Sequence, residues 1–367
     1  MKLERVIISG GGTGGHIFPA LAIAGEIRKR FPGAEILFVG AEGRMEMEKV
    51  PQAGYRIIGL PVTGMPRKPG VGMVRFVVRL LKSYNLAQKI INQFKPQIAI
   101  GVGGFASGPL LRAAAGKKVP CLIQEQNSFA GITNKLLGKK AKTICVAFER
   151  MERYFPKNKI VITGNPVREN LKITDEAKRE AINYFGLNKG KKIILVLGGS
   201  LGAQSVNEAV MMGIDKIAAA DVEFIWQTGS FYYKRIMEKL EGKIPDNLVI
   251  KEFISRMDLA YAAAGVVISR AGAGTISELC LVGKPAILVP SPNVAEDHQT
   301  KNALALVDKQ AAIMIADNEI DEKLINEALR LIDMPEECSR LANNIERMAR
   351  PHATRHIVDE AEKLLEE

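Results

Sequence analysis

The sequence predicts an α/β protein with two Rossmann-like domains, each built on a doubly wound parallel sheet and facing the other across a cleft. Short apolar runs rich in β-branched residues alternate with amphipathic stretches of helix length, which is typical of parallel sheets covered by helices on both faces. The alternation comes in two series, and each opens with a glycine-rich turn after its first strand. A length of 367 residues is long for one core and suits two.

Each series predicts its own set of strands. In the first series we expect strands at residues 6–9, 36–39, 97–102, 119–124, 143–147 and 160–163, and in the second at 192–197, 223–227, 248–251, 266–269, 286–289 and 311–315. The turn signal Gly164-Asn165-Pro166 separates the series. We therefore place the domains at residues 1–164 and 165–350. A charged amphipathic helix is expected in residues 351–367, and the sequence leaves open whether it packs back on the first domain.

The composition indicates a cytoplasmic protein. The first residues hold an apolar run of only three before Ser9 and the glycines, so we expect no signal peptide. No stretch approaches the ~18 apolar residues of a membrane span. Four cysteines lie far apart without a CxxC pair, which favours buried reduced thiols over disulfides or zinc.

The net charge of +11 is unevenly distributed. Residues 49–124 contain twelve Lys and Arg and no Asp or Glu. Such a basic region fits an anionic partner, namely membrane headgroups, nucleic acid or a polyphosphate, or else a solvated surface that lacks acids. Nucleic acid is the weaker alternative because no recognition motif or interleaved aromatic pattern occurs.

Three glycine loops follow predicted strands, at residues 10–16, 103–108 and 198–203. Glycine lets the backbone approach a bound group, and a helix that starts there presents amide groups to an anion. Each loop is therefore a candidate phosphate cradle, or alternatively a tight turn. The first fits G-x-G-x-x-G, but Glu42 lies further along than a ribose-binding acid of an NAD site should. His16 follows the last glycine, where a cofactor pyrophosphate needs no imidazole.

The second series carries a longer signal, "SRAGAGTISELCLVGKPAILVP", residues 269–290. We expect a helix from about Thr275, with Thr275 and Ser277 capping amides or meeting phosphate oxygens. Glu278 would lie in its first turn, either favouring the helix dipole or accepting hydrogen bonds from a ribose. In the polar loop that follows, His298 and Gln299 are candidates to reach sugar hydroxyls.

Residues 72–84, "GMVRFVVRLLKSY", combine a basic stripe with apolar bulk. Arg75, Arg79 and Lys82 recur at i, i+4 and i+7. A helix of this kind can lie in an anionic membrane interface, or it can be an ordinary helix covering the sheet. With the acid-free region around it, including Arg67 and Lys68, we favour membrane contact.

With these motifs assembled, the chain resembles the MurG family, the glycosyltransferases of peptidoglycan synthesis. The matching stretches are "GGTGGHIFPALAIA", "GVGGFASGPLLRAA", "QEQNSFAGITNK", "GNPVR", "GGSLGAQSVN" and residues 269–290. The resemblance implies a GT-B fold and inverting transfer of N-acetylglucosamine from UDP-N-acetylglucosamine to the C4 hydroxyl of the muramyl sugar of lipid I, giving lipid II. It also implies a peripheral place on the cytoplasmic face of the inner membrane, and other cell-wall synthesis proteins are conceivable partners.

The resemblance assigns substrate-binding positions in both domains, most of them to the donor. They are Thr13, Gly14, Gly15, Asn127, Arg168, Ser200, Ile254, Ala273, Gly274, Thr275, Glu278, His298 and Gln299. Thr13, Gly14 and Gly15 match the family's first donor-contacting loop, where the glycines can shape a site for phosphates of the acceptor or the donor. The backbone of Ile254 would meet the uracil, and Glu278 the ribose. His298 stands where some relatives have glutamine, and Gly274 where some have leucine.

The chemistry of the transfer needs compensation for charge on the leaving UDP and a base for the acceptor hydroxyl. No Asp-x-Asp pair occurs, so we expect helix N-termini and loop amides to supply the compensation, with no metal ligands and no cofactor. Histidine accepts a proton well near neutral pH. His16 is therefore the candidate base, with Glu125 as the alternative, while a purely structural role for His16 stays open.

Overall fold

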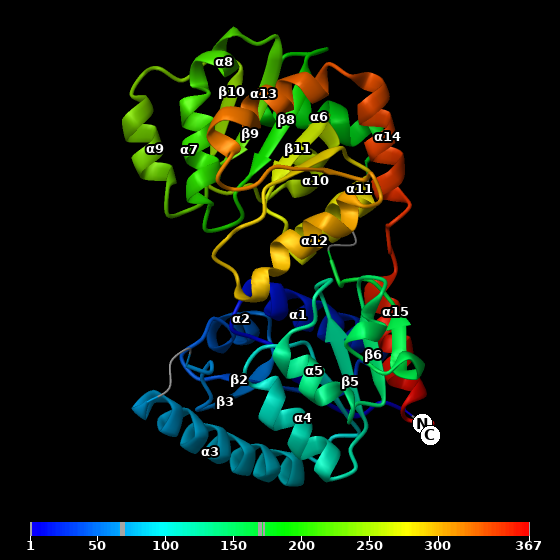
Figure 1. The fold of residues 1–367 in the computed structure, drawn as a ribbon. Helices are drawn as coiled ribbons and strands as arrows, with labels where there is room; N and C mark the ends of the chain where they lie inside the picture. Colours follow the sequence, from blue (N-terminus) through cyan, green and yellow to red (C-terminus); the bar gives the residue numbers. More distant parts are fainter. Residues whose placement is uncertain (1, 67–69, 168–170, 172, 367) are drawn as a thin grey trace. The chain divides into compact units, whose positions relative to one another are not determined.

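The computed structural model divides the chain into two compact units, Met1–Val167 with His352–Glu367, and Arg168–Pro351. It describes residues 2–66, 70–167, 171 and 173–366. Each unit contains one sheet whose strands all run parallel. The predicted fold class, two doubly wound α/β domains, is confirmed (Figure 1).

The first unit has a sheet of order β3-β2-β1-β4-β5-β6-β7. Its strands are β1 (Arg5–Ser9), β2 (Glu35–Ala41), β3 (Arg56–Leu60), β4 (Ile98–Gly101), β5 (Cys121–Glu125), β6 (Thr143–Val146) and β7 (Ile160–Ile162). Its helices are α1 (Gly14–Arg30), α2 (Glu46–Gln52), α3 (Val71–Phe94), α4 (Ser107–Gly116), α5 (Ile132–Gly138) and α15 (Ala353–Lys363), with 3-10 turns at Met151–Arg153 and Lys157–Lys159.

Alternation along the strands separates two cores in this unit. Val6 and Ile8 of β1 pack in one cluster with α1 and α15, whereas Ile7 faces the other cluster with α3, α4 and α5. The C-terminal helix α15 thus belongs to the first unit and lies on α1. Arg30 of α1 holds it there through ion pairs with Asp359 at 2.5 Å and Glu362 at 2.9 Å.

The second unit has a sheet of order β10-β9-β8-β11-β12-β13. Its strands are β8 (Lys192–Leu197), β9 (Val222–Gln227), β10 (Leu248–Lys251), β11 (Val266–Ser269), β12 (Ala286–Leu288) and β13 (Ile313–Met314). Its helices are α6 (Asp175–Phe185), α7 (Gln204–Met212), α8 (Ile214–Ala219), α9 (Tyr233–Leu240), α10 (Met257–Ala263), α11 (Ala273–Val282), α12 (His298–Val307), α13 (Ile320–Ile332) and α14 (Pro335–Glu346), with a 3-10 turn at Ala295–Asp297. Trp226 and Phe224 of β9 fill its main core.

The structure corrects the predicted strands at one place. The prediction omits β3, which pairs with β2 at the edge of the first sheet. Its sequence RIIGL is short, contains a glycine and is only partly buried, so it carries neither a long apolar run nor a clean alternation. The other predicted strands are present, with ends that differ by a few residues.

Candidate functional site

The glycine loops lie where the order of each sheet reverses. In the first unit the chain runs outward from β1 to β2 and β3 on one side and to β4 on the other. The loops after β1 and β4 are therefore neighbours at the carboxyl ends of adjacent strands. The second unit repeats this arrangement at β8 and β11. Ligands of open α/β sheets bind at such switch points, so the loops are in the expected places.

The two glycine loops of the first unit touch each other around His16. His16 is the third residue of α1 and is partly exposed. A Cβ atom added to Gly103 would lie 3.1 Å from the His16 Nε2 atom, and one added to Gly104 would lie 2.4 Å from the Gly11 carbonyl oxygen. Both positions also have φ near +90°, which glycine tolerates best. The glycines thus let the two loops and the imidazole approach closely.

Thr13, Gly14 and Gly15 form the start of α1 beside this imidazole. Thr13 is the N-cap in an extended conformation, and the carbonyl oxygen of Thr13 accepts a hydrogen bond from the His16 amide at 3.1 Å. Thr13 and Gly15 are exposed. The first turn contains no acidic residue, so its positive end can receive an anion.

Glu125 lies at the end of β5 with its carboxylate enclosed. The residue is 2% exposed, and one carboxylate oxygen accepts hydrogen bonds from Asn134 Nδ2 at 2.9 Å and Gly131 N at 3.0 Å. The other accepts from the backbone amide of Asn127 at 3.1 Å and from its side-chain amide at 3.4 Å. Burial raises the pKa of the Glu125 carboxyl above its ordinary value, although these hydrogen bonds act in the opposite direction. The contacts favour a structural role, in which Glu125 shapes the 126–131 loop and fixes Asn127.

In the second unit, Gln227 joins two predicted donor-binding segments. Ser200 is exposed in the loop after β8, and the neighbouring Gly199 carbonyl accepts a hydrogen bond from Gln227 Nε2 at 3.0 Å. Gln227 Oε1 accepts from the Ile254 amide at 2.8 Å. Ile254 is buried, so its backbone position depends on this side chain. The sequence analysis missed Gln227.

Helix α11 presents Ala273, Gly274, Thr275 and Glu278, with two corrections to the prediction. The helix begins at Ala273 with Gly272 as N-cap and has no acidic residue in its first turn, so Glu278 lies in the second turn and the dipole role does not apply. Ser277 also lies in the second turn, where its hydroxyl donates to the Ala273 carbonyl at 2.9 Å. Because the start of the helix is rich in glycine, few side chains there would block an approaching phosphate.

Glu278 is held by a tyrosine from the preceding helix. The hydroxyl of Tyr261, a fully buried residue of α10, donates to Glu278 Oε2 at 3.1 Å. A charged acceptor makes this a strong kind of hydrogen bond. The sequence analysis missed Tyr261 because nothing in the local pattern separates it from an ordinary core aromatic.

Arg270 connects the loops around α11. Its guanidinium donates to Ser205 Oγ at 2.7 Å and to the carbonyl oxygens of Val289 and Pro290 at 3.2 and 3.3 Å, and it pairs with Asp317. These contacts tie the ends of β11 and β12 to α7 and to the segment after β13, so Arg270 fixes the ends of several strands together.

The polar pair His298 and Gln299 opens α12. Gln299 Oε1 accepts a hydrogen bond from the Ser291 amide at 2.9 Å, which positions this side chain at the loop that follows β12. Arg168 lies outside the described residues, as do Arg67 and Lys68.

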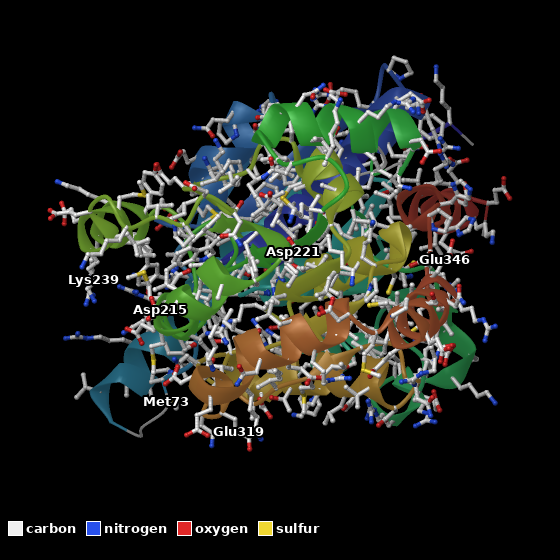
Figure 2. All side chains as sticks on the ribbon, turned by 90° about the horizontal axis from the view of Figure 1, so that it is seen from above. Met73, Asp215, Asp221, Lys239, Glu319 and Glu346 are labelled. Atoms are coloured by element: carbon white, nitrogen blue, oxygen red, sulfur yellow. The ribbon has the colours of Figure 1, made fainter. Side chains whose placement is uncertain are left out.

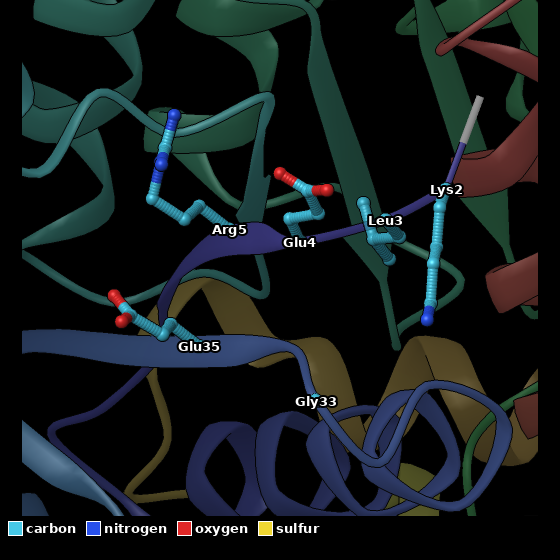
Figure 3. Close-up of a pocket in the computed structure, with 6 residues that line it drawn as sticks. All are labelled: Lys2, Leu3, Glu4, Arg5, Gly33 and Glu35. Atoms are coloured by element: carbon cyan, nitrogen blue, oxygen red, sulfur yellow. The ribbon is translucent and has the colours of Figure 1, made fainter.

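A shallow hollow of about 290 Å³ lies elsewhere on the first unit, lined by residues 2–5, Gly33 and Glu35 (Figure 3). It is located where β1 and β2 begin. Because the glycine loops lie at the opposite ends of these strands, the hollow is not part of the candidate site.

Two family models match the chain, the glycosyltransferase family 28 N-terminal domain over residues 6–146 and the C-terminal domain of the same family over residues 193–358. The chain belongs to glycosyltransferase family 28, and the predicted enzyme class, a glycosyltransferase, is confirmed.

Curated relatives and a solved structure indicate which kind of glycosyltransferase of this family the chain resembles. The chain is 58% identical over 366 residues to the UDP-N-acetylglucosamine–N-acetylmuramyl-(pentapeptide) pyrophosphoryl-undecaprenol N-acetylglucosamine transferase of Parabacteroides distasonis, covering 100% of both chains. It is 50% identical over 366 residues to the same transferase of Flavobacterium psychrophilum, covering 100% of this chain and 99% of that one. The crystal structure of Acinetobacter baumannii MurG matches with a TM-score of 0.80 and 29% identity, covering 98% of this chain and 99% of that one. These matches confirm the resemblance found in the motifs.

Proposed function

We propose that this protein transfers N-acetylglucosamine from UDP-N-acetylglucosamine to the C4 hydroxyl of the muramyl sugar of undecaprenyl-pyrophosphoryl-N-acetylmuramyl-pentapeptide, with inversion at the anomeric carbon. The full-length similarity to transferases named for this reaction is the observation that carries the proposal. The distribution of the candidate residues over two glycine-lined switch points supports it, because the reaction needs one site for each of two substrates.

The second unit is proposed to bind the donor. Glu278, steadied by Tyr261, accepts hydrogen bonds from the ribose hydroxyls, and the backbone of Ile254, set by Gln227, meets the uracil. The start of α11 with Ala273, Gly274 and Thr275 receives the diphosphate. Preorganised amides of this kind stabilise the charge that develops on the leaving UDP as the glycosidic bond breaks. Ser200, Gln299 and His298 complete the contacts to phosphate and sugar, and Arg168 is assigned there from its motif alone.

The first unit is proposed to bind the acceptor and to supply the base. His16 is a partly exposed residue whose imidazole lies against Gly103 of the second glycine loop, and it takes the proton of the C4 hydroxyl as that oxygen attacks the anomeric carbon. Glu125, the alternative base, has both carboxylate oxygens occupied by hydrogen bonds. The start of α1, with Thr13, Gly14 and Gly15, suits the acceptor diphosphate.

Helix α3 is proposed to rest on an anionic membrane at the cytoplasmic face. Its residues 71–82 have no buried side chain, whereas buried residues begin at Ser83. The apolar Val71, Val74, Val77, Val78 and Leu81 are exposed together with Arg75, Arg79 and Lys82, and Met73 marks this part of α3 in Figure 2. No helix in the described part of the chain is long and apolar enough to cross a bilayer.

The test is a transfer assay with radiolabelled UDP-N-acetylglucosamine and a short-chain analogue of the lipid-linked muramyl pentapeptide. The proposal expects a β-1,4-linked disaccharide on the lipid and slower transfer from UDP-glucose. Transfer only to a different lipid or small-molecule acceptor would leave the donor assignment and refute the acceptor. Failure to bind UDP combined with binding of NADH would replace the proposal with a dinucleotide-binding protein.

A further inference from the structure

A buried carboxylate is hydrogen-bonded to the first glycine loop, the loop that follows β1. Glu46 is the first residue of α2 and is 0% exposed. One carboxylate oxygen accepts a hydrogen bond from the Gly12 amide at 2.8 Å, and the other accepts from the Ala41 amide at 3.0 Å. The side chain therefore connects the loop after β1 to the end of β2.

The chain makes room for this carboxylate with two glycines. A Cβ atom at Gly11 would lie 2.2 Å from Glu46 Oε1, and one at Gly40 would lie 2.5 Å from Glu46 Cγ. A Cβ atom at either distance would overlap the Glu46 side chain, and the close packing of the interior leaves little room for that side chain to shift. Gly11, Gly40 and Glu46 thus form one interlocked arrangement.

Backbone contacts connect the Gly11, Gly40 and Glu46 arrangement to the imidazole of His16. The Gly11 carbonyl lies against Gly104, and the adjacent Gly103 lies against the ring of His16. The amide of Gly12 is already used by Glu46. The Gly12 amide is therefore not available to a phosphate at this loop, whereas the amides at the start of α1 remain for it.

We infer that Glu46 is a positioning residue, which fixes the first glycine loop and through it the placement of His16 and the acceptor diphosphate. The inference rests on the proposed function of this loop. Burying a carboxylate is costly unless hydrogen bonds satisfy it, and both oxygens here are bonded to backbone amides. An amide in its place keeps one acceptor and turns a donor toward the second backbone N–H, so the loop must move.

The test compares Glu46→Gln with Glu48→Gln. Glu48 lies on the same helix α2 but is exposed, so it is a matched control for the same chemical change. For Glu46→Gln we expect kcat on the lipid-linked acceptor to fall by about 10²-fold, as small misplacements of catalytic groups do, with a higher KM for the acceptor. The Kd for UDP should stay unchanged because its candidate site belongs to the other unit. Hydrogen exchange of the amides of residues 10–16 should accelerate, while Glu48→Gln behaves as wild type.

A second variant covers the case in which Glu46→Gln does not fold. Gly40→Ala leaves the carboxylate in place but presses on the Cγ atom of Glu46, and it should give the same loss of kcat with unchanged UDP affinity. Wild-type kcat and acceptor KM in either folded variant would overturn the inference. If the wild-type protein itself transfers no sugar, the proposed function fails, and hydrogen exchange then decides alone: equal exchange in the two Gln variants would refute the role of Glu46, and faster exchange in Glu46→Gln would support it.

Discussion

The exposed half of α3 makes the most quantitative prediction. We would replace Val74 with Thr and Leu81 with Gln, which removes apolar character with little change in size. Val74 is 65% exposed and Leu81 is 59% exposed. Burying such a side chain completely contributes about 1.5–3 kcal/mol, so the exposed fractions correspond to roughly 1–2 kcal/mol each. The double variant should therefore lose about 2–4 kcal/mol of membrane affinity, or roughly 30- to 1,000-fold in the partition constant.

Cosedimentation with vesicles of mixed phosphatidylglycerol and phosphatidylcholine measures this loss. Met212 of α7 is 66% exposed, and Met212→Gln is the matched control because it removes a similarly exposed apolar side chain from the second unit. Replacing Arg75, Arg79 and Lys82 by Gln should remove about 1 kcal/mol each at low ionic strength and less at high salt. The reasoning is refuted if the Val74 and Leu81 double variant binds vesicles as tightly as the Met212 control.

Two further predictions concern the second unit. Tyr261→Phe removes the hydrogen bond to the Glu278 carboxylate, and a hydrogen bond to a charged group contributes about 1.5–3 kcal/mol. We therefore expect KM for the UDP donor to rise by roughly tenfold or more with kcat retained. An unchanged KM and an unchanged preference for UDP over 2′-deoxy-UDP would exclude a role of Tyr261 in positioning Glu278. Burial lowers the pKa of Lys284 to about 8, and its Nζ donates to the Ala264 carbonyl at 2.6 Å. Between pH 8 and 10.5 the unfolded chain then binds more protons at Lys284 than the folded chain does. The free energy of unfolding of wild type, measured by chemical denaturation, should therefore rise through this window relative to Lys284→Met. Parallel plots of the unfolding free energy against pH for the two proteins would contradict the prediction.

The parts of the fold that depend on local patterns could be predicted from the sequence. Strands such as β8, β10 and β11 have the bounds that their apolar runs predict. The glycine loops could be placed because they follow such runs, and doubly wound sheets put the ends of neighbouring strands together. The edge strand β3 could not be predicted, since its few residues form a strand only through pairing with β2.

The supporting residues of the site could not be predicted because their partners are distant in sequence. Glu46 meets Gly12 across 34 positions, and Gln227 meets Ile254 across 27. In the sequence, both are ordinary polar residues near the end of an element. For Glu125 the sequence predicts a carboxylate at the end of a strand, but it does not reveal the four hydrogen bonds that the side chain accepts.

The central claim is that the two units divide the reaction, with the donor bound by the second unit and the acceptor proton removed by His16 of the first. The most direct test is the rate of N-acetylglucosamine transfer in the presence of EDTA by wild type and by His16→Ala, with UDP affinity measured on the same samples. The account predicts metal-independent transfer by wild type, and in the variant a loss of about 10²-fold or more with unchanged UDP binding. Transfer at the wild-type rate by His16→Ala would contradict it.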